Sequence, residues 1–311
     1  MNSPNRERGD GRKDLPPAFC NKGLTHPKRN CLSFNYAFGV SAGSANLISY
    51  IAGQEGRAYM FYREYSGRPE YMSPSNFVQT GSFINMDYIY STLSNSDGEY
   101  PLDFEAADAS DTELTVVATN AITGKPAYFS RRWMDQDSYD IFKASCSIPV
   151  VNKPYSIGGV PFFDGALSDP IPLEKALEKG ADKVVIILTK PKDTIRKPTK
   201  DKVLASLMKH YPLAAEGLRT RADRYNETVA RAKELEKEGR VLIIAPDDTC
   251  GVDTLNRSSD NLHKLYVKGL LDGLKIKDFL EAPIVSADKE QVEADESEHS
   301  APADNTDNPE A

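Results

Sequence analysis

A chain of 311 residues with 40% hydrophobic and 9% aromatic content can bury one large α/β core or two small ones, which excludes a disordered or fibrous protein. The net charge of −8 gives no electrostatic case for nucleic-acid binding, so we expect no nucleic-acid partner. No apolar run approaches the 18 or more residues of a membrane span, so we expect no transmembrane helix.

The two ends of the chain differ from its middle in composition. Residues 1–30 are polar and basic and lack the apolar core of a secretory signal, so we expect a poorly ordered segment there. Residues 282–311 carry nine acids and one lysine, which predicts a disordered acidic tail. Between them, residues 31–281 are expected to form the folded domain.

Cysteine usage indicates a reducing environment. The four cysteines have no CxxC spacing, and four in a chain of this length do not suggest a disulfide scaffold: Cys20, Cys31, Cys146 and Cys250. We therefore expect a cytoplasmic location and no structural disulfide.

Short β-branched or apolar runs alternate with helical patterns along the middle of the chain. The runs predict buried strands at residues 34–38, 114–119, 183–188 and 240–245. Residues 54–105 predict helices and loops, residues 173–179 predict a helix that ends at Gly180, and residues 216–239 predict a long amphipathic helix. The alternation predicts an α/β fold of three layers, with a mainly parallel sheet between helices.

The stretch Gly39-Val40-Ser41-Ala42-Gly43 lies between the first predicted strand and a helix-forming segment. This arrangement fits the G-x-S-x-G nucleophile elbow, in which a strained turn presents a serine at a helix N-terminus. We expect both glycines to be required because a Cβ at either position would approach neighbouring backbone too closely. The motif is short, and an inert serine in a tight turn is the alternative.

A nucleophilic serine needs a base, and the histidines are poorly placed to supply one. His26 and His299 lie in the two end segments, whereas His210 and His263 lie in helical stretches, so a Ser-Asp-His triad stays an alternative only. The carboxylate alternative is Asp164, which follows an apolar run and precedes Gly165 and Ala166. An aspartate at a strand end can point into a cleft, although Asp-Gly is also typical of a hairpin turn.

Several segments together resemble the patatin-like phospholipase family, in particular its bacterial members. The resemblance covers about residues 33–280 and rests on GVSAGSAN (39–46), ATNAITGKPAYF (118–129), KASCSIPVV (143–151), FFDGALSDPIPLEKAL (162–177), DKVVIILTKP (182–191) and RVLIIAPDDTCGVDTL (240–255). The pairing of GxSxG with DG[GA] in this order is more specific than either motif alone. The resemblance implies a patatin-like α/β fold.

The resemblance also implies a mechanism and a substrate class. Ser41 would be the nucleophile that forms an acyl-enzyme, and Asp164 would be the general base, without a histidine, a metal or another cofactor. The expected substrates are acyl esters of lipids, in lipid degradation, with transient contact with a membrane surface. Gly39, Ala42, Gly43, Gly165 and Ala166 would complete the motifs, and Asp169 is interpreted as a helix cap rather than a catalytic group.

One family feature is not recognisable in the sequence. Members of the family carry a glycine-rich oxyanion loop about 30 residues before the GxSxG motif, where this chain has only Gly9, Gly11 and Arg12 in a polar stretch. The loss of an oxyanion-hole donor costs about 2.7–4 kcal/mol of barrier. A catalytically impaired relative that acts as a binding or regulatory module is therefore a second hypothesis. The oligomeric state is left open.

Overall fold

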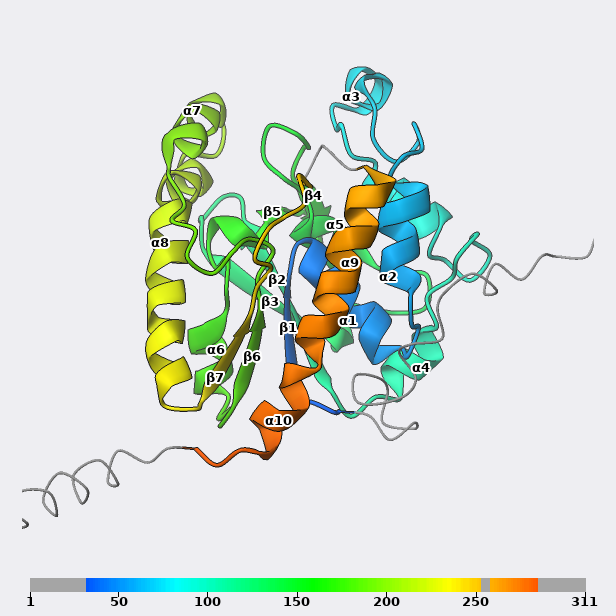
Figure 1. Ribbon diagram of the computed structural model, residues 1–311. Coiled ribbons are helices and arrows are strands. Elements are labelled where there is room, and N and C mark those ends of the chain that lie inside the picture. The colour runs from blue at the N-terminus through cyan, green and yellow to red at the C-terminus, as the bar shows by residue number, and fades with distance from the viewer. Residues whose placement is uncertain (1–31, 253–257, 285–311) are drawn as a thin grey trace, which may run out of the picture.

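The computed structural model describes residues 32–252 and 258–284, and within them a central sheet has helices on both sides (Figure 1). The five strands of this sheet have the order β1-β2-β5-β4, and β3 also pairs with β2. A second sheet consists of β6 and β7. The strands are β1 (Tyr36–Val40), β2 (Glu113–Asn120), β3 (Pro126–Ser130), β4 (Tyr155–Ile157), β5 (Val160–Asp164), β6 (Val184–Ile187) and β7 (Val241–Ile244).

Helices occupy the connections between strands. The first half of the chain forms α1 (Ala42–Ile51), α2 (Arg57–Met60), α3 (Pro74–Thr80), α4 (Phe104–Asp108) and α5 (Asp140–Ser145), with short π- or 3₁₀-helical turns η3 (Phe61–Tyr65), η4 (Tyr88–Thr92) and η5 (Arg131–Trp133). The second half forms η6 (Gly165–Leu167), α6 (Leu173–Glu178), α7 (Thr199–Leu207), α8 (Pro212–Lys237), α9 (Ser259–Gly273) and α10 (Lys275–Glu281). The predicted helices and strands are confirmed, with shifts of a few residues at their ends.

The prediction of an α/β fold is confirmed, but the prediction of a mainly parallel sheet is wrong. β1 pairs with β2 in parallel, whereas β3 and β5 are antiparallel to β2, and β4 is antiparallel to β5. The reason is that short turns, rather than helical crossovers, connect β2 to β3 and β4 to β5, and a short turn can only join antiparallel strands. Only the β6–β7 pair shares the parallel arrangement of β1 and β2 among the described strands.

Strand β2 is the centre of the fold. Its alternate side chains point to opposite faces of the sheet, and each face is covered by a different hydrophobic cluster. Leu114, Val116 and Ala118 belong to the cluster that α1 and α5 cover, whereas η6 and the α7–α8 segment cover the opposite face with Leu167 and Leu218. β2 therefore holds fixed the two strands beside it, β1 and β5.

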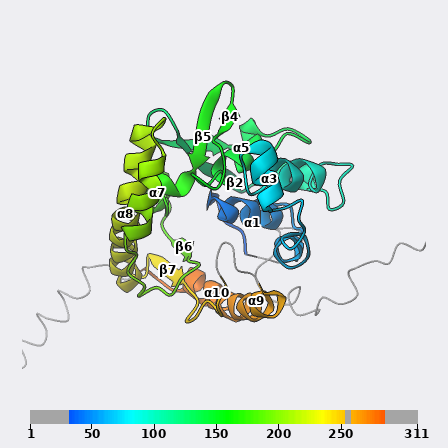
Figure 2. The same cartoon turned by 90° about the horizontal axis from the view of Figure 1, so that it is seen from above.

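The second sheet is covered less completely than its sequence predicts. β6 and β7 pack against α6 and α8 through their own hydrophobic cluster. The side chain of Ile187 in β6 is 68% exposed, so the expectation that this strand is buried on both faces is wrong. Figure 2 shows α8 on the outer side of this sheet, which explains why only one face of β6 is deeply buried.

Candidate active site

Ser41 lies in the turn between β1 and α1, with backbone angles of φ 54° and ψ −133°. A positive φ is strained for serine, and such strain is typical of functional positions. A Cβ at residue 39 would lie 2.4 Å from the Cα of Ser44, so Gly39 is required by close backbone approach. Ser41 occupies the N-cap position of α1, yet its side chain caps no helical N–H group, which leaves the hydroxyl available for other partners.

The second glycine of the motif has a different environment. A Cβ at Gly43 would meet no heavy atom of the described residues within 4 Å. The prediction that Gly43 is required by crowding is therefore wrong. Gly43 is already in the first turn of α1, beyond the point where the turn passes close to other backbone.

Asp164 ends β5 and lies on the same edge of β2 as Ser41. Val40, the residue before Ser41, pairs with Val117 of β2, and Asp164 pairs with the next residue, Ala118. Because β3 pairs with residues 115–119 on the opposite edge of β2, β1 and β5 lie end to end along one edge, and Ser41 and Asp164 stand where the two strands meet. The two residues that the sequence singled out are thus brought to one place.

The carboxyl group of Asp164 is buried, with only 5% of the residue exposed. Burial raises its pKa above the usual aspartate value, and hydrogen bonding with the side chain of Ser41 opposes that rise. The backbone N–H of Ala166 donates to the carboxylate over 2.9 Å, and the charge of Arg221 acts in the same direction. The arrangement holds a desolvated carboxylate next to the serine hydroxyl.

The Asp164-Gly165 pair is a strand-to-helix junction. β5 ends at Asp164 and η6 begins at Gly165, whereas the β4–β5 hairpin turns at Gly158 and Gly159. The hairpin alternative for Asp164-Gly165 is therefore wrong. A Cβ at residue 165 would lie 2.2 Å from the carbonyl oxygen of Val117, so glycine is required there by the passage of η6 over β2.

The segment 145–147, at the end of α5, contacts both of these residues. The Oγ of Ser145 accepts a hydrogen bond from the backbone N–H of Ser41 over 2.8 Å and donates to the carbonyl of Val117 over 2.6 Å. The carbonyl of Ser147 accepts from the backbone N–H of Asp164 over 2.9 Å. Ser145 and Ser147 could not be singled out as site residues from the sequence, because no pattern of composition or spacing distinguishes them. They entered only as part of KASCSIPVV (143–151), one of the stretches on which the family resemblance rests.

Cys146 lies beside Ser41 and Asp164, and its thiol is buried and free. Its Sγ is 3.1 Å from the hydroxyl of Tyr90. Burial raises the pKa of this thiol to about 12, against hydrogen bonding with Tyr90 and Ser41. Cys146 therefore stays a neutral thiol at physiological pH, and the ionisable group next to Ser41 is Asp164.

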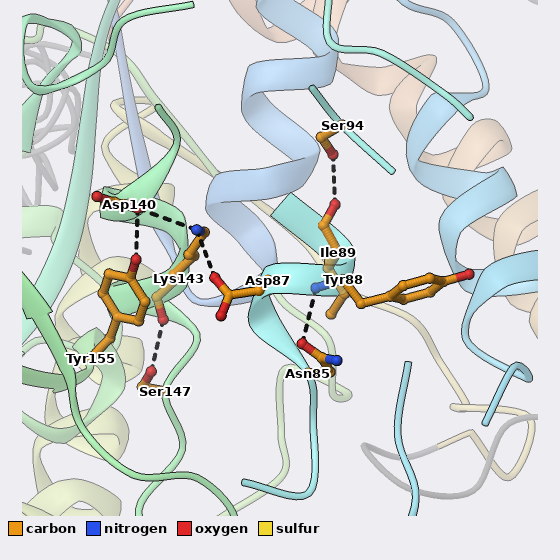
Figure 3. Close-up of polar contacts among 9 residues, drawn as sticks. All are labelled: Asn85, Asp87, Tyr88, Ile89, Ser94, Asp140, Lys143, Ser147 and Tyr155. Atoms are coloured by element: carbon orange, nitrogen blue, oxygen red, sulfur yellow. Dashed lines mark hydrogen bonds and ion pairs between the residues drawn. The ribbon is translucent and has the colours of Figure 1, made fainter. Parts of the chain in front are cut away.

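An ion-pair cluster around Lys143 holds α5 in place (Figure 3). The Nζ of Lys143 is 2.8 Å from a carboxylate oxygen of Asp87 and 3.3 Å from one of Asp140. The hydroxyl of Tyr155 donates to Asp140 over 2.7 Å, and that of Ser147 donates to the carbonyl of Lys143 over 2.8 Å. Burial of Lys143 opposes its charge, but the bond to Asp87 and the nearby acids raise its pKa overall. The cluster fixes α5 and so the segment 145–147.

The other candidate residues are not brought to this site. His263, on α9, has its Nδ1 2.8 Å from the hydroxyl of Tyr59, and His210 is exposed between α7 and α8. The carboxylate of Asp169 accepts from the hydroxyl of Tyr128, whereas Pro172 occupies the N-cap of α6. The interpretation of Asp169 as a helix cap is wrong, because the helix begins only after Pro170 and Pro172.

Several expectations fall on residues that are not described. Gly9, Gly11 and Arg12 lie outside the described residues, as do His26, His299, Cys20 and Cys31. Within residues 32–252 and 258–284, no helix is long and apolar enough to cross a membrane. In the same ranges, no group of three or more His, Cys, Asp or Glu side chains is placed to hold a metal ion.

Comparison with known proteins identifies the group to which this site belongs. A profile of the patatin-like phospholipase family matches residues 20–177, which is just over half of the chain and includes Ser41 and Asp164. The chain belongs to the patatin-like phospholipase family. Members of this family are typically serine hydrolases, and the resemblance seen in the sequence is confirmed.

The rest of the chain has a second match. A domain of unknown function, DUF6363, matches residues 211–282, which contain α8, β7, α9 and α10. The uncharacterized protein YjjU of Escherichia coli (strain K12) is 29% identical over 165 residues. That alignment covers 51% of this chain and 44% of YjjU, so the chain spans less than half of the length of this curated relative.

Proposed function

We propose that this protein is a serine acyl-ester hydrolase that uses Ser41 as the nucleophile and Asp164 as the general base. The observation that carries the proposal is the pairing of a strained serine at a helix N-terminus with a buried carboxylate that hydrogen-bonds to its side chain. A serine hydroxyl is a weak nucleophile until a base takes its proton, and Asp164 is the ionisable group positioned to do so.

The reaction proceeds in two stages. Asp164 takes the hydroxyl proton of Ser41 as the Oγ of Ser41 bonds to the ester carbonyl carbon. The ester C–O bond then breaks, and the proton passes from Asp164 to the departing alcohol. This leaves an acyl group on Ser41. Asp164 then takes a proton from a water molecule as its oxygen attacks the acyl carbon. The bond from that carbon to the Oγ of Ser41 breaks, Asp164 returns the proton to the Oγ, and the carboxylic acid leaves.

The developing oxyanion needs hydrogen-bond donors. Helix α1 begins at Ala42, directly after Ser41, so the positive end of its dipole and the N–H groups of Ala42 and Gly43 lie next to the nucleophile in the chain. Ala42 thereby supplies a donor position in the elbow. Donors of this kind stabilise the transition state by about 2.7–4 kcal/mol each.

The substrates we propose are acyl esters of lipids, in keeping with the family's phospholipase description. The second candidate, a non-catalytic binding or regulatory protein, differs in that Ser41 would not become acylated. A histidine-dependent triad finds no support in the positions of His210 and His263, which have other surroundings.

Hydrolysis of short- and long-chain p-nitrophenyl esters and of phospholipid tests the proposal. We expect Ser41→Ala and Asp164→Asn to lose at least about 10³-fold in kcat, because each removes a reacting group. His210→Ala and His263→Ala are matched controls that should stay within about twofold. Activity that survives Ser41→Ala, or that disappears with either histidine, would overturn the proposed dyad.

A further inference from the structure

Residues 195–213, referred to below as the α7 surface, combine exposed apolar and basic side chains. Four large apolar residues are more than half exposed: Ile195 (71%), Val203 (63%), Leu207 (60%) and Leu213 (56%). The lysines Lys197, Lys200, Lys202 and Lys209 are exposed between them. Such a combination is costly for a surface that meets only water, so it points to a partner.

The acidic residue of this stretch does not offset the lysines at the surface. Asp201 is 8% exposed, and both of its carboxylate oxygens bind Arg221 of α8, at 2.6 and 3.0 Å. Every fully exposed ionisable side chain from residue 195 to residue 213 is therefore a lysine or His210. The α7 surface is positive although the chain as a whole carries a charge of −8.

Helix α7 presents apolar residues on two faces. Its inner face packs Leu204, Ala205 and Met208 into a core cluster with α8 and η6. Val203 and Leu207, four residues apart and so on one side of the helix, point away from that cluster. The outer face of α7 is thus a second apolar stripe flanked by lysines, and its apolar residues take no part in the core cluster.

The α7 surface adjoins the candidate active site. Tyr211, between α7 and α8, packs edge-on against Phe163, the residue before Asp164, with ring centroids 5.3 Å apart. The backbone of Leu213 lies against Gly124, in the turn that follows β2. Figures 1 and 2 show α7 beside α8, on the left of both views.

We propose that the α7 surface docks on an anionic lipid surface and places Ser41 at the interface. Apolar side chains at such a site enter the acyl region while lysine stems extend their ammonium groups to the headgroups. Each lysine near an anionic membrane strengthens binding by about fivefold. The proposal deepens the proposed function and rests on it for its biological meaning, although lipid binding itself requires no catalysis.

Sedimentation with vesicles of phosphatidylcholine, with and without phosphatidylglycerol, tests this inference. The full chain with Ser41→Ala is used, so that failure of the hydrolase proposal does not affect the result. We expect binding to the anionic vesicles, and a loss of about tenfold or more for Lys200→Glu/Lys202→Glu, because each reversal replaces an attraction by a repulsion. Val203→Ser/Leu207→Ser should also weaken binding.

Matched controls lie on α9, where Lys264 is exposed and Leu271 is 62% exposed. Lys264→Glu and Leu271→Ser should bind as the parent does, and melting curves should show that all variants are folded. Binding to neither vesicle type, or an equal loss for the α9 controls, would overturn the proposal. Self-association through the α7 surface, measured by light scattering and abolished by the same variants, would also overturn it in favour of a second copy.

A second inference has a separate basis, the hydroxyl of Ser145. It is completely buried, accepts from the N–H of Ser41 and donates to the carbonyl of Val117. One side-chain atom thus ties the strained nucleophile turn to the central strand. We infer that Ser145 is a positioning residue, which holds the backbone of Ser41 in the conformation that aims its hydroxyl at Asp164. This inference rests on the proposed function.

Ser147 provides a matched control two residues away, because it holds Asp164 through its backbone carbonyl, which Ser147→Ala keeps. Its hydroxyl is also buried and makes a hydrogen bond of similar length, 2.8 Å, but to the carbonyl of Lys143 in the helix that precedes it. We expect Ser145→Ala and Ser147→Ala to lower the melting temperature alike. Only Ser145→Ala should lower kcat, by about tenfold or more with KM unchanged, because misplacement of a reacting atom slows the chemical step.

The rate at which a fluorophosphonate labels Ser41 is a second readout, which does not depend on the identity of the ester. It should fall in Ser145→Ala in proportion to kcat. Ser145→Cys, which keeps a polar atom, replaces Ser145→Ala if the latter does not fold, and should also label more slowly than Ser147→Ala. Equal kcat and equal labelling rates for the variants of residues 145 and 147 would overturn the inference, whereas a wild-type protein inert to every ester would count against the function instead.

Discussion

At the scale of single residues, the two glycines of the GxSxG motif are not equivalent. Gly39 has no room for a Cβ, since one would lie 2.4 Å from the Cα of Ser44, whereas Gly43 faces open space among the described residues. The first glycine is therefore required by the path of the backbone. The second meets no close contact among the described residues and does not have a positive φ.

This difference predicts the effects of two alanine substitutions. Gly39→Ala should destabilise the protein by about 2 kcal/mol or more, because backbone must move to accept the Cβ. Gly43→Ala should be neutral or stabilise α1 by up to about 1 kcal/mol, because alanine favours helix over glycine. Chemical denaturation measures both. Equal destabilisation by the two variants would contradict the assignment.

The pKa of Asp164 governs how activity depends on pH. A base must be ionised, and burial raises the pKa of Asp164 above its usual value. The acidic limb of kcat/KM should therefore lie at higher pH than the value of about 3.9 for an exposed aspartate. The raised pKa also means that the folded state binds a proton more tightly than the unfolded state.

The same shift affects stability with the opposite sign to that of a salt-bridged aspartate. As the pH rises from the unfolded pKa of Asp164 to its folded pKa, the protein loses stability. In this range the unfolded chain gives up the proton readily, whereas burial disfavours the ionised carboxylate in the folded state. Asp164→Asn should remove this dependence while it abolishes activity. A rate profile whose acidic limb lies at or below pH 4 would contradict a desolvated base.

At the scale of elements, α5 is the support of the site. Ion pairs of Lys143 with Asp87 and Asp140 hold it (Figure 3). The segment 145–147 at its C-terminal end contacts both Ser41 and Asp164. The side chain of Lys143 is only 8% exposed, whereas that of Asp87 is 75% exposed. The loss of Lys143 would leave its acidic partners in contact with water rather than buried.

Lys143→Met should therefore lower the free energy of unfolding at neutral pH by about 1–2 kcal/mol. This is the contribution of a charge-assisted pair minus the cost of burying the lysine charge, which methionine does not incur. Since the pKa of Lys143 is raised, its contribution persists up to and beyond the usual lysine value and is lost only at higher pH. A deficit that stays constant as the pH rises well above the usual lysine value would indicate packing alone.

Elements also show what could be predicted from the sequence. The strands and helices follow from apolar periodicity, and the position of Ser41 follows from a strand, a glycine and a helix in succession. The antiparallel placement of β5 could not be predicted, because the register of Asp164 against Ala118 depends on pairing between distant segments. The role of Ser145 could not be predicted either, since a buried serine resembles any other in sequence.

At the scale of the whole molecule, the described chain has two sheets with separate cores. β2 has completely buried side chains at Leu114, Val116, Val117 and Ala118, whereas β6 and β7 share a cluster with α6 and α8 and leave Ile187 exposed. Regions with fewer buried contacts open more readily. The candidate site belongs to the first sheet, where the strands are buried most completely.

Hydrogen exchange should reflect this division. Amides of β2 are expected to exchange most slowly, close to the global unfolding limit, and those of β6 and β7 at least about tenfold faster, because they can open with the second sheet alone. Mass spectrometry of peptides from the two sheets measures the rates. Indistinguishable protection of β2 and β6 would mean that the two sheets unfold as one unit.

The central claim is that Ser41, activated by Asp164, becomes covalently modified in catalysis. Labelling with a fluorophosphonate, followed by intact-mass measurement and peptide mapping, tests it most directly. We predict one adduct per chain, located on Ser41, absent in Ser41→Ala and formed at least about 100-fold more slowly in Asp164→Asn. A folded protein that forms no adduct, that carries it on another residue, or that labels equally fast without the carboxylate of Asp164 would contradict the claim.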